Sequence, residues 1–239
     1  ADISRSNIPE FLRTIWDRKC TKRTVMTIPY NAKPFSNRSY IREALKEKGV
    51  EIEKDDLTQT VQAVRGAMNN VVPGPMAVMR WIEAEVSKAI TRGDKELTWT
   101  TPSGFVVNQK LMKRHVERLQ LQLLGKCEMY IATGNTNEVD KNRHKAATAP
   151  NLIHSLDSSL LCLSTMRFDA PIATIHDSVL CRATDMSYLS TLVRETYMHL
   201  FAKHDFLTDF AKQINAETEP PIIGDLQPET VIDSTYFFC

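Results

Sequence analysis

The chain has 239 residues, of which 42% are hydrophobic and 25% are charged, and this composition is ordinary for a globular protein. The formal net charge of +1 gives no general indication of a nucleic-acid partner. The five cysteines include no C-x-x-C pair, which argues against a structural zinc site. Their odd number and the lack of a signal peptide favour a reducing, cytoplasmic location, and no apolar run approaches the roughly 18 residues that a membrane span requires.

The charges are unevenly distributed along the chain. Between Arg13 and Arg42, eight Lys or Arg residues accompany a single acid, Asp17, whereas the segment from Asp205 to the C-terminus has seven acids and one base. Blocks of opposite sign predict one face for an anionic ligand and another face that is solvated or contacts a basic partner. The alternative is that both blocks are only solvated surface.

The first predicted helix runs from about Ile8 to Tyr30. Asn7 and Glu10 have the spacing of a capping box, and Pro9 lies in the first turn, where its missing N–H costs little. Pro29 is expected to bend or tighten the end of the helix.

One face of this predicted helix carries two cations, a thioether and a phenol, namely Arg18, Lys22, Met26 and Tyr30. Residues four apart on an α-helix lie on one face. Such a stripe suits a nucleoside triphosphate, because Arg18 and Lys22 can meet phosphates and Tyr30 can stack on or abut the base and sugar. Arg23 lies beside the stripe. The alternative is an amphipathic helix whose basic face contacts only solvent.

The middle of the chain is expected to be mixed in structure. Helices are predicted at about 39–47, 51–72 and 75–90. The segment 97–109 has two β-prone runs around the turn residues Pro102, Ser103 and Gly104, which predicts a hairpin.

The next segments are less regular in sequence. Residues 111–133 begin with a helical pattern and become strand-like, and residues 134–150 are polar and rich in Gly and Asn, as in an exposed loop or hairpin tip. A helix is predicted at 150–166, and two strands joined by a tight turn at 170–183. A further helix follows Asp185 or Ser187, with an apolar side formed by Leu189, Leu192, Val193, Tyr197 and Leu200.

The tight turn at His176, Asp177 and Ser178 holds a carboxylate at the tip of a hairpin. Carboxylates are natural ligands of Mg²⁺, which commonly takes one or two of them together with substrate phosphates. The alternative is that these three residues are only turn formers.

The histidines give one further candidate. His154, near the start of a predicted helix, can hydrogen-bond a sugar hydroxyl, and the alternative is a satisfied polar group at the edge of a core. The remaining histidines have no metal-ligand spacing, and we expect surface or structural roles for His115, His144, His199 and His204.

Five segments, in chain order, closely resemble the C-terminal part of the phage-type single-subunit RNA polymerases, a family that includes the mitochondrial enzymes. They are TKRTVMTIPYN, RLQLQLLG, APNLIHSLDSS, IHDSV and the terminal DSTYFFC. The resemblance extends over nearly the whole chain. Its strongest blocks are the basic helix and the His-Asp-Ser turn, which together are specific although neither is so alone.

The resemblance implies that the basic helix is the nucleotide-binding helix of the fingers. Arg18 and Lys22 would hold the incoming triphosphate, with Arg23 and Met26 beside them. Tyr30 would check the ribose and close over the templating base pair.

The resemblance also assigns residues further along the chain. His154 would lie near the ribose 2′-hydroxyl, and Asp177 would be the second metal-binding aspartate. Residues from about 116 to 148 would form the specificity hairpin that enters the promoter major groove. Arg118 and Gln120 are its expected base readers, since Arg suits guanine and Gln suits adenine. The expected catalytic set is Lys22, Tyr30, His154 and Asp177.

The expected fold is mixed α and β and mostly helical, with fingers helices and a palm β-hairpin of the right-hand polymerase fold. Residues 1–154 would form the fingers subdomain, including the hairpin, and residues 155–239 the C-terminal palm portion. The implied reaction is DNA-templated ribonucleotidyl transfer with two Mg²⁺ ions, using ribonucleoside triphosphates, a DNA template and promoter, and the nascent RNA.

The chain departs from the family pattern in two places. Asn31 stands where the family usually has Gly, and the block with the first catalytic aspartate, expected upstream of the basic helix, is missing. We therefore expect a split polymerase whose complementary chain carries the N-terminal region, the thumb and the first aspartate, so that this chain is inactive alone. A phage-encoded enzyme would act in the cytoplasm of the bacterial host.

Two alternatives stay open. A fragment of a related family-A-like DNA polymerase would usually have His-Asp-Glu where this chain has His176, Asp177 and Ser178, and it would lack the specificity hairpin. A non-catalytic nucleic-acid-binding remnant would explain the missing aspartate.

Overall fold

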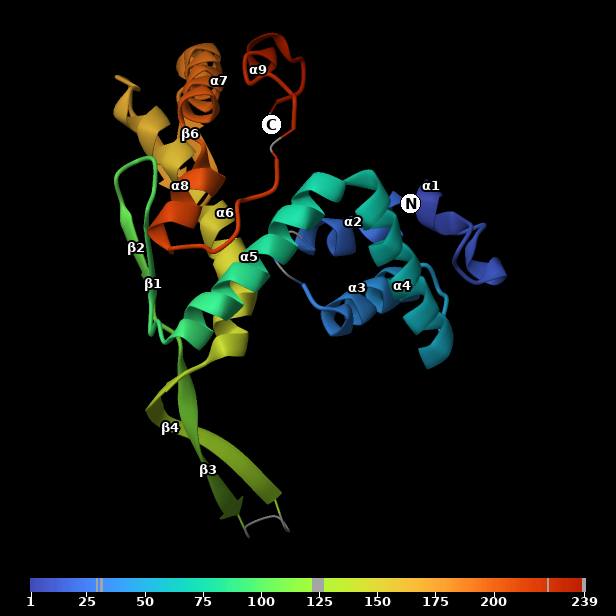
Figure 1. Cartoon of the computed structure of the whole chain (residues 1–239). Helices are drawn as coiled ribbons and strands as arrows, with labels where there is room; N and C mark the ends of the chain where they lie inside the picture. Colours follow the sequence, from blue (N-terminus) through green and yellow to red (C-terminus); the bar gives the residue numbers. More distant parts are fainter. Residues whose placement is uncertain (29, 31, 122–126, 223, 238–239) are drawn as a thin grey trace. The chain divides into compact units, whose positions relative to one another are not determined.

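The computed structural model describes residues 1–28, 30, 32–121, 127–222 and 224–237 (Figure 1), except for the side chains at 121 and 127. The chain forms two compact units. Unit 1 comprises residues 1–83, 149–151 and 220–225, and unit 2 comprises the remainder. In the described part of the chain no helix is both long and apolar enough to cross a membrane.

Unit 1 is helical. Its elements are α1 (Asp2–Arg5), a short 3-10 helix η1 (Glu10–Leu12), α2 (Arg18–Thr27), α3 (Pro34–Lys46), α4 (Lys54–Val71) and the first half of α5 (Pro73–Arg92). Helix α2 packs against α3 and α4, and α3 packs against α4. Apolar residues at helical spacing on α4, Leu57, Val61 and Val64, face the core. The other core residues are Ile8, Leu12, Trp16, Cys20, Ile41, Leu45 and Ala63.

The predicted continuous helix from Ile8 to Tyr30 is wrong. The 3-10 helix ends at Leu12, and α2 starts only at Arg18. Side chains satisfy the backbone at this break, because Arg5 donates to the Trp16 carbonyl (2.6 Å) and the Asp17 carboxylate accepts from the Cys20 N–H (3.2 Å). A new N-cap at Asp17 therefore replaces the intrahelical bonds that a continuous helix would have made.

Unit 2 contains three two-stranded antiparallel sheets and the C-terminal helices. The strands are β1 (Leu97–Thr100), β2 (Val106–Gln109), β3 (Met112–Leu121), β4 (Cys127–Val139), β5 (Ile172–Ile175) and β6 (Ser178–Cys181). The helices are α6 (Lys141–Met166), the 3-10 helix η2 (Ala183–Asp185), α7 (Met186–Lys203), α8 (Phe206–Gln213) and α9 (Thr230–Asp233). The hairpins predicted at 97–109 and 170–183 are confirmed, with β1 paired to β2 and β5 to β6.

The structure corrects the prediction for residues 111–150. The residue pattern predicted a helical start at 111 and an exposed loop or hairpin tip at 134–150, whereas the chain forms the strands β3 and β4. They pair as a hairpin, as the family resemblance led us to expect for about 116–148, and α6 begins at Lys141 rather than at 150. The helical pattern was misleading because β3 has no buried face that would require strict alternation of apolar and polar side chains. Asp140 starts α6, since its carboxylate accepts from the Arg143 N–H at 3.0 Å.

Two apolar contacts organise unit 2. Trp99 on β1 meets Phe210 on α8 edge to face, with ring centroids 5.6 Å apart, and its indole N–H donates to Ser155 Oγ on α6 (3.2 Å). The buried residues Phe168, Leu189 and Leu192 form a second cluster, against which side chains from β5 and β6 pack. The β5–β6 hairpin is thereby held on α7.

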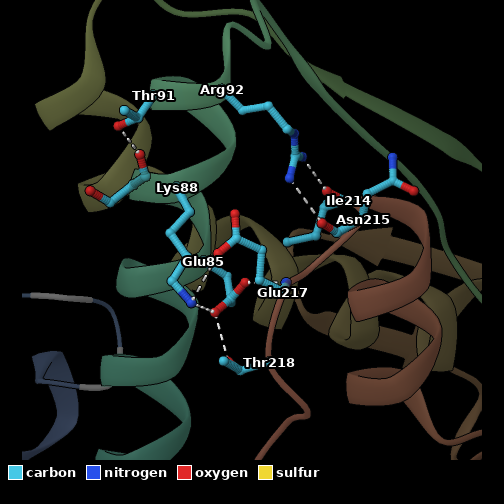
Figure 2. Close-up of polar contacts among 9 residues, drawn as sticks. Glu85, Lys88, Thr91, Arg92, Ile214, Asn215, Glu217 and Thr218 are labelled. Carbon is cyan, nitrogen blue, oxygen red and sulfur yellow. Dashed lines mark hydrogen bonds and ion pairs between the residues drawn. The ribbon is translucent and has the colours of Figure 1, made fainter.

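The C-terminal half of α5 holds the segment that follows α8 (Figure 2). Glu85 is only 2% exposed, and its carboxylate accepts hydrogen bonds from the Glu217 N–H, Thr218 Oγ1 and Lys88 Nζ, each at 2.7 Å. Arg92 donates to the carbonyls of Ile214 and Asn215 at 3.1 Å. A guanidinium at the C-terminus of α8 also complements the helix dipole.

The polar contacts of Glu85 overcome the cost of its burial. Burial raises the pKa of the Glu85 carboxyl, but the hydrogen bonds from Lys88, Thr218 and the Glu217 N–H more than offset this effect, so the pKa lies below the ordinary value of 4.5. Lowering of the pKa on folding means that the charged group stabilises the fold above about pH 4.5 and that this stabilisation is lost as the pH falls through the folded-state pKa.

We predict that Glu85→Gln lowers the free energy of unfolding by about 1 to 3 kcal/mol near neutral pH, since the buried donors lose a charged acceptor. The difference from wild type should shrink below about pH 4.5, and denaturant unfolding at several pH values measures it. Glu83→Gln, two residues earlier on α5, is the matched control and should change stability little, because Glu83 makes an exposed pair with Lys33. A pH-independent difference for Glu85→Gln would contradict the role of its charge.

Candidate functional site

Helix α2 presents the predicted basic stripe on an exposed face of unit 1. Arg18, Lys22 and Met26 are all exposed, whereas the opposite face of the helix is buried through Cys20, Thr21 and Thr24. Within the described residues, neither Arg18 nor Lys22 has an ion-pair or hydrogen-bond partner for its side-chain cation. Two cations one helical turn apart are thus available to an anionic ligand.

Arg23 differs from these two cations, because it already has partners within unit 1. Its guanidinium donates to Glu43 at 2.7 Å and lies 4.3 Å from the centroid of the Tyr40 ring. Lys19 on the same helix pairs with Glu47 at 2.8 Å. Arg23 therefore connects α2 to α3 through an ion pair. Of the three predicted cations, Arg18 and Lys22 are the two without a partner among the described residues.

Tyr30 lies beyond the end of α2. The helix ends at Thr27, and the Tyr30 N–H donates to the Thr27 carbonyl at 3.1 Å within a turn, so the prediction that Tyr30 is on the helix is wrong. Its side chain is 42% exposed. Pro29 and Asn31, including the replacement of the family's Gly, lie outside the described residues.

The start of α2 is held by a charged contact. Lys48 donates to Asp17 at 2.7 Å while the other carboxylate oxygen caps the helix at the Cys20 N–H. The hydrogen bond from Lys48 and then that from the Cys20 backbone lower the pKa of Asp17 from 3.8 to about 2, against the opposing effect of desolvation. The Asp17 carboxylate is therefore charged at any pH well above 2, and it fixes where α2 begins.

In unit 2, His176 and Asp177 form the turn between β5 and β6. Ile175 pairs with Ser178 across the hairpin, so the two residues are its tip. His176 has φ of 55°, a left-handed conformation that is uncommon for residues other than glycine and in which histidine is enriched. Asp177 is exposed, as the prediction of an accessible metal-binding carboxylate requires.

Asp157, which the sequence analysis did not single out, is a neighbour of both predicted residues of unit 2. It lies one turn after His154 on α6, and both side chains are on the exposed side of the helix. Loss of hydration raises the pKa of Asp157, the nearby His154 lowers it, and the negative charge of Asp177 raises it. This electrostatic coupling shows that His154, Asp157 and Asp177 lie near one another. The His-x-x-Asp spacing of His154 and Asp157 was the feature of the sequence that could have pointed to Asp157.

The β3–β4 hairpin carries the predicted base readers. Arg118 and Gln120 are two residues apart on β3 and exposed, so they share one face of the strand. Arg118 lies opposite Tyr130, and its guanidinium contacts the Glu128 carboxylate. Residues 122–126, at the tip, lie outside the described part of the chain. Reading a base through Arg118 would require exchange of its Glu128 contact for one to the base.

The predicted site residues fall in both units. Arg18, Lys22, Arg23, Met26 and Tyr30 belong to unit 1, whereas Arg118, Gln120, His154 and Asp177 belong to unit 2. In the described ranges, no three His, Cys, Asp or Glu residues converge to hold a metal ion. Asp177 fits Mg²⁺ by its chemistry, an exposed carboxylate at a hairpin tip, but as one ligand of a larger set.

Comparison with known proteins identifies the class. The family model described as DNA-dependent RNA polymerase matches residues 2–236, and the chain belongs to this family. This confirms the resemblance to the phage-type enzymes drawn from the sequence motifs.

Three relatives illustrate the extent of the match. The DNA-directed RNA polymerase of Pseudomonas phage phiKMV is 30% identical over 239 residues, covering 94% of this chain and 29% of that protein. The mitochondrial DNA-directed RNA polymerase 1 of Arabidopsis thaliana is 32% identical, covering 93% of this chain and 24% of that protein. DNA-directed RNA polymerase 2A of Nicotiana tabacum is 29% identical, with 93% and 69% covered. The chain thus spans less than a third of the length of the first two relatives.

Proposed function

We propose that this chain supplies the nucleotide-binding helix and the second metal-binding aspartate of a DNA-directed RNA polymerase that extends RNA on a DNA template. Membership of the polymerase family supports the reaction class. The observation that carries the assignment of roles is the pair of exposed cations on α2, Arg18 and Lys22, which have no side-chain partner among the residues that the structure describes. They lie where the family's motif has its triphosphate-binding residues.

The proposed fold for the complete enzyme is the right-hand polymerase architecture, with residues 1–154 contributing to the fingers and residues 155–239 to the palm. The mixed, mostly helical structure with small antiparallel hairpins is compatible with this division. This division by proposed function differs from the division of the chain into two compact units.

In the proposed reaction, Arg18 and Lys22 bind the triphosphate and neutralise charge that builds up as pyrophosphate leaves. Met26 on α2 and Tyr30 in the turn after it contact the base and sugar, and Arg23 supports α2 through Glu43. His154 hydrogen-bonds the ribose 2′-hydroxyl and so favours ribonucleotides.

Asp177 is the residue of this chain that would hold Mg²⁺. Two bound Mg²⁺ ions would supply activation of the RNA 3′-hydroxyl and stabilisation of the leaving pyrophosphate. Asp157, coupled electrostatically to Asp177, adds negative charge beside the same hairpin tip. The carboxylate of the first catalytic aspartate must come from elsewhere.

The proposed partners follow from these roles. Ribonucleoside triphosphates, template and promoter DNA and nascent RNA are the ligands, and Arg118 and Gln120 on the β3–β4 hairpin read promoter bases. A complementary chain would provide the N-terminal region, the thumb and the first aspartate. For a phage-encoded enzyme the site of action would be the cytoplasm of the bacterial host.

A non-catalytic nucleic-acid-binding remnant is the second candidate function. The observation that favours it is the exposure of Arg18, Lys22 and most side chains of the β3–β4 hairpin, which binding without catalysis would also use. The DNA polymerase alternative is set aside, because the family model and the relatives named above are RNA polymerases. Nucleotide incorporation by the assembled enzyme separates the two remaining candidates.

We predict that Asp177→Asn in the assembled polymerase abolishes nucleotide incorporation while sparing DNA binding, because an amide is a poor, uncharged ligand for Mg²⁺. Asp169→Asn is the matched control, since Asp169 is an exposed carboxylate of unit 2 shortly before β5, and it should retain activity. Primer extension and a gel-shift assay on the same preparations measure the two properties. Incorporation above about a tenth of wild type in Asp177→Asn would remove this residue from the metal site.

We predict that Tyr30→Phe reduces discrimination against deoxynucleotides by about one to two powers of ten while chain extension continues, since a lost hydrogen bond at the sugar costs about 1 to 3 kcal/mol. Competition between ribo- and deoxynucleoside triphosphates measures the ratio. Tyr188→Phe is the control, because its hydroxyl lies near the Arg167 carbonyl (3.4 Å) in unit 2. An unchanged ratio in Tyr30→Phe would show that the phenol has no part in ribose selection.

A further inference from the structure

The base of the β3–β4 hairpin is a tightly bonded junction within unit 2. The chain leaves β2 at Gln109, starts β3 at Met112 and returns directly into α6 through Asp140 (Figure 1). Only Lys110 and Leu111 lie between the end of β2 and the start of β3. The direction in which the hairpin extends from unit 2 is therefore set within a few residues.

His144, on the first turns of α6, is fully buried at this junction, with 0% exposure. Its Nε2 accepts the Leu111 backbone N–H at 3.0 Å, and its Nδ1 lies 3.1 Å from the side-chain amide of Gln109. Gln109 and Thr148 are buried as well, and Gln109 Nε2 donates to Thr148 Oγ1 at 2.9 Å. One imidazole thus connects α6 to both the last residue of β2 and the residue before β3.

The contacts fix the protonation state of the ring. The Leu111 N–H can only donate, so Nε2 must carry the lone pair, and the proton of a neutral ring is on Nδ1. Nδ1 lies against the side-chain amide of Gln109, whose Nε2 donates to Thr148 Oγ1. Burial lowers the pKa of His144, Asp140 opposes this and Arg143 adds to it, which favours the neutral form.

Two further hydrogen bonds, donated by residues that follow β4, hold the same junction. The Asp140 N–H donates to the Leu111 carbonyl at 2.9 Å, and the Arg143 guanidinium donates to the Met112 carbonyl at 3.3 Å. Beyond this point the strands have exposed side chains, and their pairing is irregular between Met112 and Val116. The bonds to α6 are consequently the main restraint on the angle of the hairpin.

A small change of angle at this base would move the base readers by a large distance. Arg118 lies six residues after Met112, which is roughly 20 Å along a strand at about 3.3 Å per residue. A rotation of about 10° at the base displaces that position by about 3.5 Å, close to the spacing of about 3.4 Å between successive base pairs. Reading of a particular base therefore depends on the rigidity of the junction.

We propose that His144 is a positioning residue for promoter recognition, which locks the base of the β3–β4 hairpin to α6 through Leu111 and Gln109 and so sets the register of Arg118 and Gln120 on the DNA. The inference rests on the proposed function of the hairpin as a promoter reader. A purely structural histidine would affect stability and all activities together, whereas a positioning residue affects promoter-directed initiation far more than extension of a primer already annealed to template.

The test uses two substitutions at the same position. His144→Leu keeps an apolar side chain but leaves the Leu111 N–H without its acceptor, whereas His144→Gln can place an amide oxygen near the position of Nε2. Trp99→Phe is the control, because it removes a buried hydrogen bond of unit 2, to Ser155, that involves none of residues 109–112 or 140–144. Arg143→Ala is a milder variant at an exposed side chain, useful if His144→Leu does not fold.

Two measurements are made. Amide hydrogen exchange on this chain reports opening of β3 and β4, and the assembled polymerase is assayed for promoter-directed initiation and for extension of an annealed primer. We expect His144→Leu to speed exchange in the hairpin and to lower the ratio of promoter-directed to primer-directed synthesis about tenfold, corresponding to the loss of one base contact. His144→Gln should recover most of the ratio, Arg143→Ala should lower it less, and Trp99→Phe should leave it unchanged.

The outcomes distinguish failure of the positioning role of His144 from failure of promoter reading by the β3–β4 hairpin. Arg118→Ala and Gln120→Ala are measured in parallel on promoters changed at single bases. If they alter base preference while His144→Leu and Arg143→Ala leave the initiation ratio unchanged, the positioning role of His144 is contradicted, and the role of the hairpin in reading the promoter is retained. If neither alters base preference, the hairpin is not the promoter reader and the inference falls with it. An equal loss in both assays for His144→Leu would also overturn the proposal.

Discussion

The N-terminal cap of α2 is the contact on which the basic face of unit 1 depends. Arg5 takes up the Trp16 carbonyl, Asp17 caps the helix, and Lys48 holds the Asp17 carboxylate, so α2 begins at a fixed residue. With that start, the buried face of the helix falls on Cys20, Thr21 and Thr24, and the opposite face presents the cations. The capping contacts fix where α2 begins, and burial of Cys20, Thr21 and Thr24 fixes which face is exposed. The exposure of Arg18 and Lys22 follows from both.

Unit 2 depends on comparable polar anchors that fix the ends of its elements. Glu85 and Arg92 hold the segment after α8, Asp140 starts α6, and His144 fixes the base of the β3–β4 hairpin. Glu85 and His144 are buried, and buried polar groups are costly unless they are satisfied, but each of the two has several partners. They therefore specify where the chain turns, while the apolar contacts of Trp99 and of the Phe168 cluster supply the general stability of the unit. Of the residues proposed to be functional, Arg118 lies on β3 and His154 on α6, and the starts of these two elements are fixed by His144 and Asp140.

Much of this arrangement could be predicted from the sequence, and the failures have physical causes. Short-range signals worked well: turn residues predicted the hairpins at 97–109 and 170–183, and the stripe of cations was recognised on the right helix. The helix break before Arg18 was missed because the cap depends on Arg5 and Lys48, which are distant in sequence. The residue pattern of β3 and β4 was misread because neither face is buried, so their side chains have no clear period, and only the family resemblance predicted a hairpin there. The spacing of His154 and Asp157 was visible in the sequence, but the coupling of Asp157 to Asp177 and the buried role of His144 depend on contacts with another element.

The central proposal is that this chain contributes the nucleotide-binding helix and one metal-binding aspartate to a polymerase and requires a further chain for synthesis. The most direct measurement is templated RNA synthesis with Mg²⁺ by the purified chain, first alone and then after addition of a chain that carries the N-terminal region, the thumb and the first aspartate. Carboxylates must bridge both metal ions, so the account predicts no synthesis by this chain alone and robust synthesis by the mixture. Robust templated synthesis by the isolated chain would contradict the account.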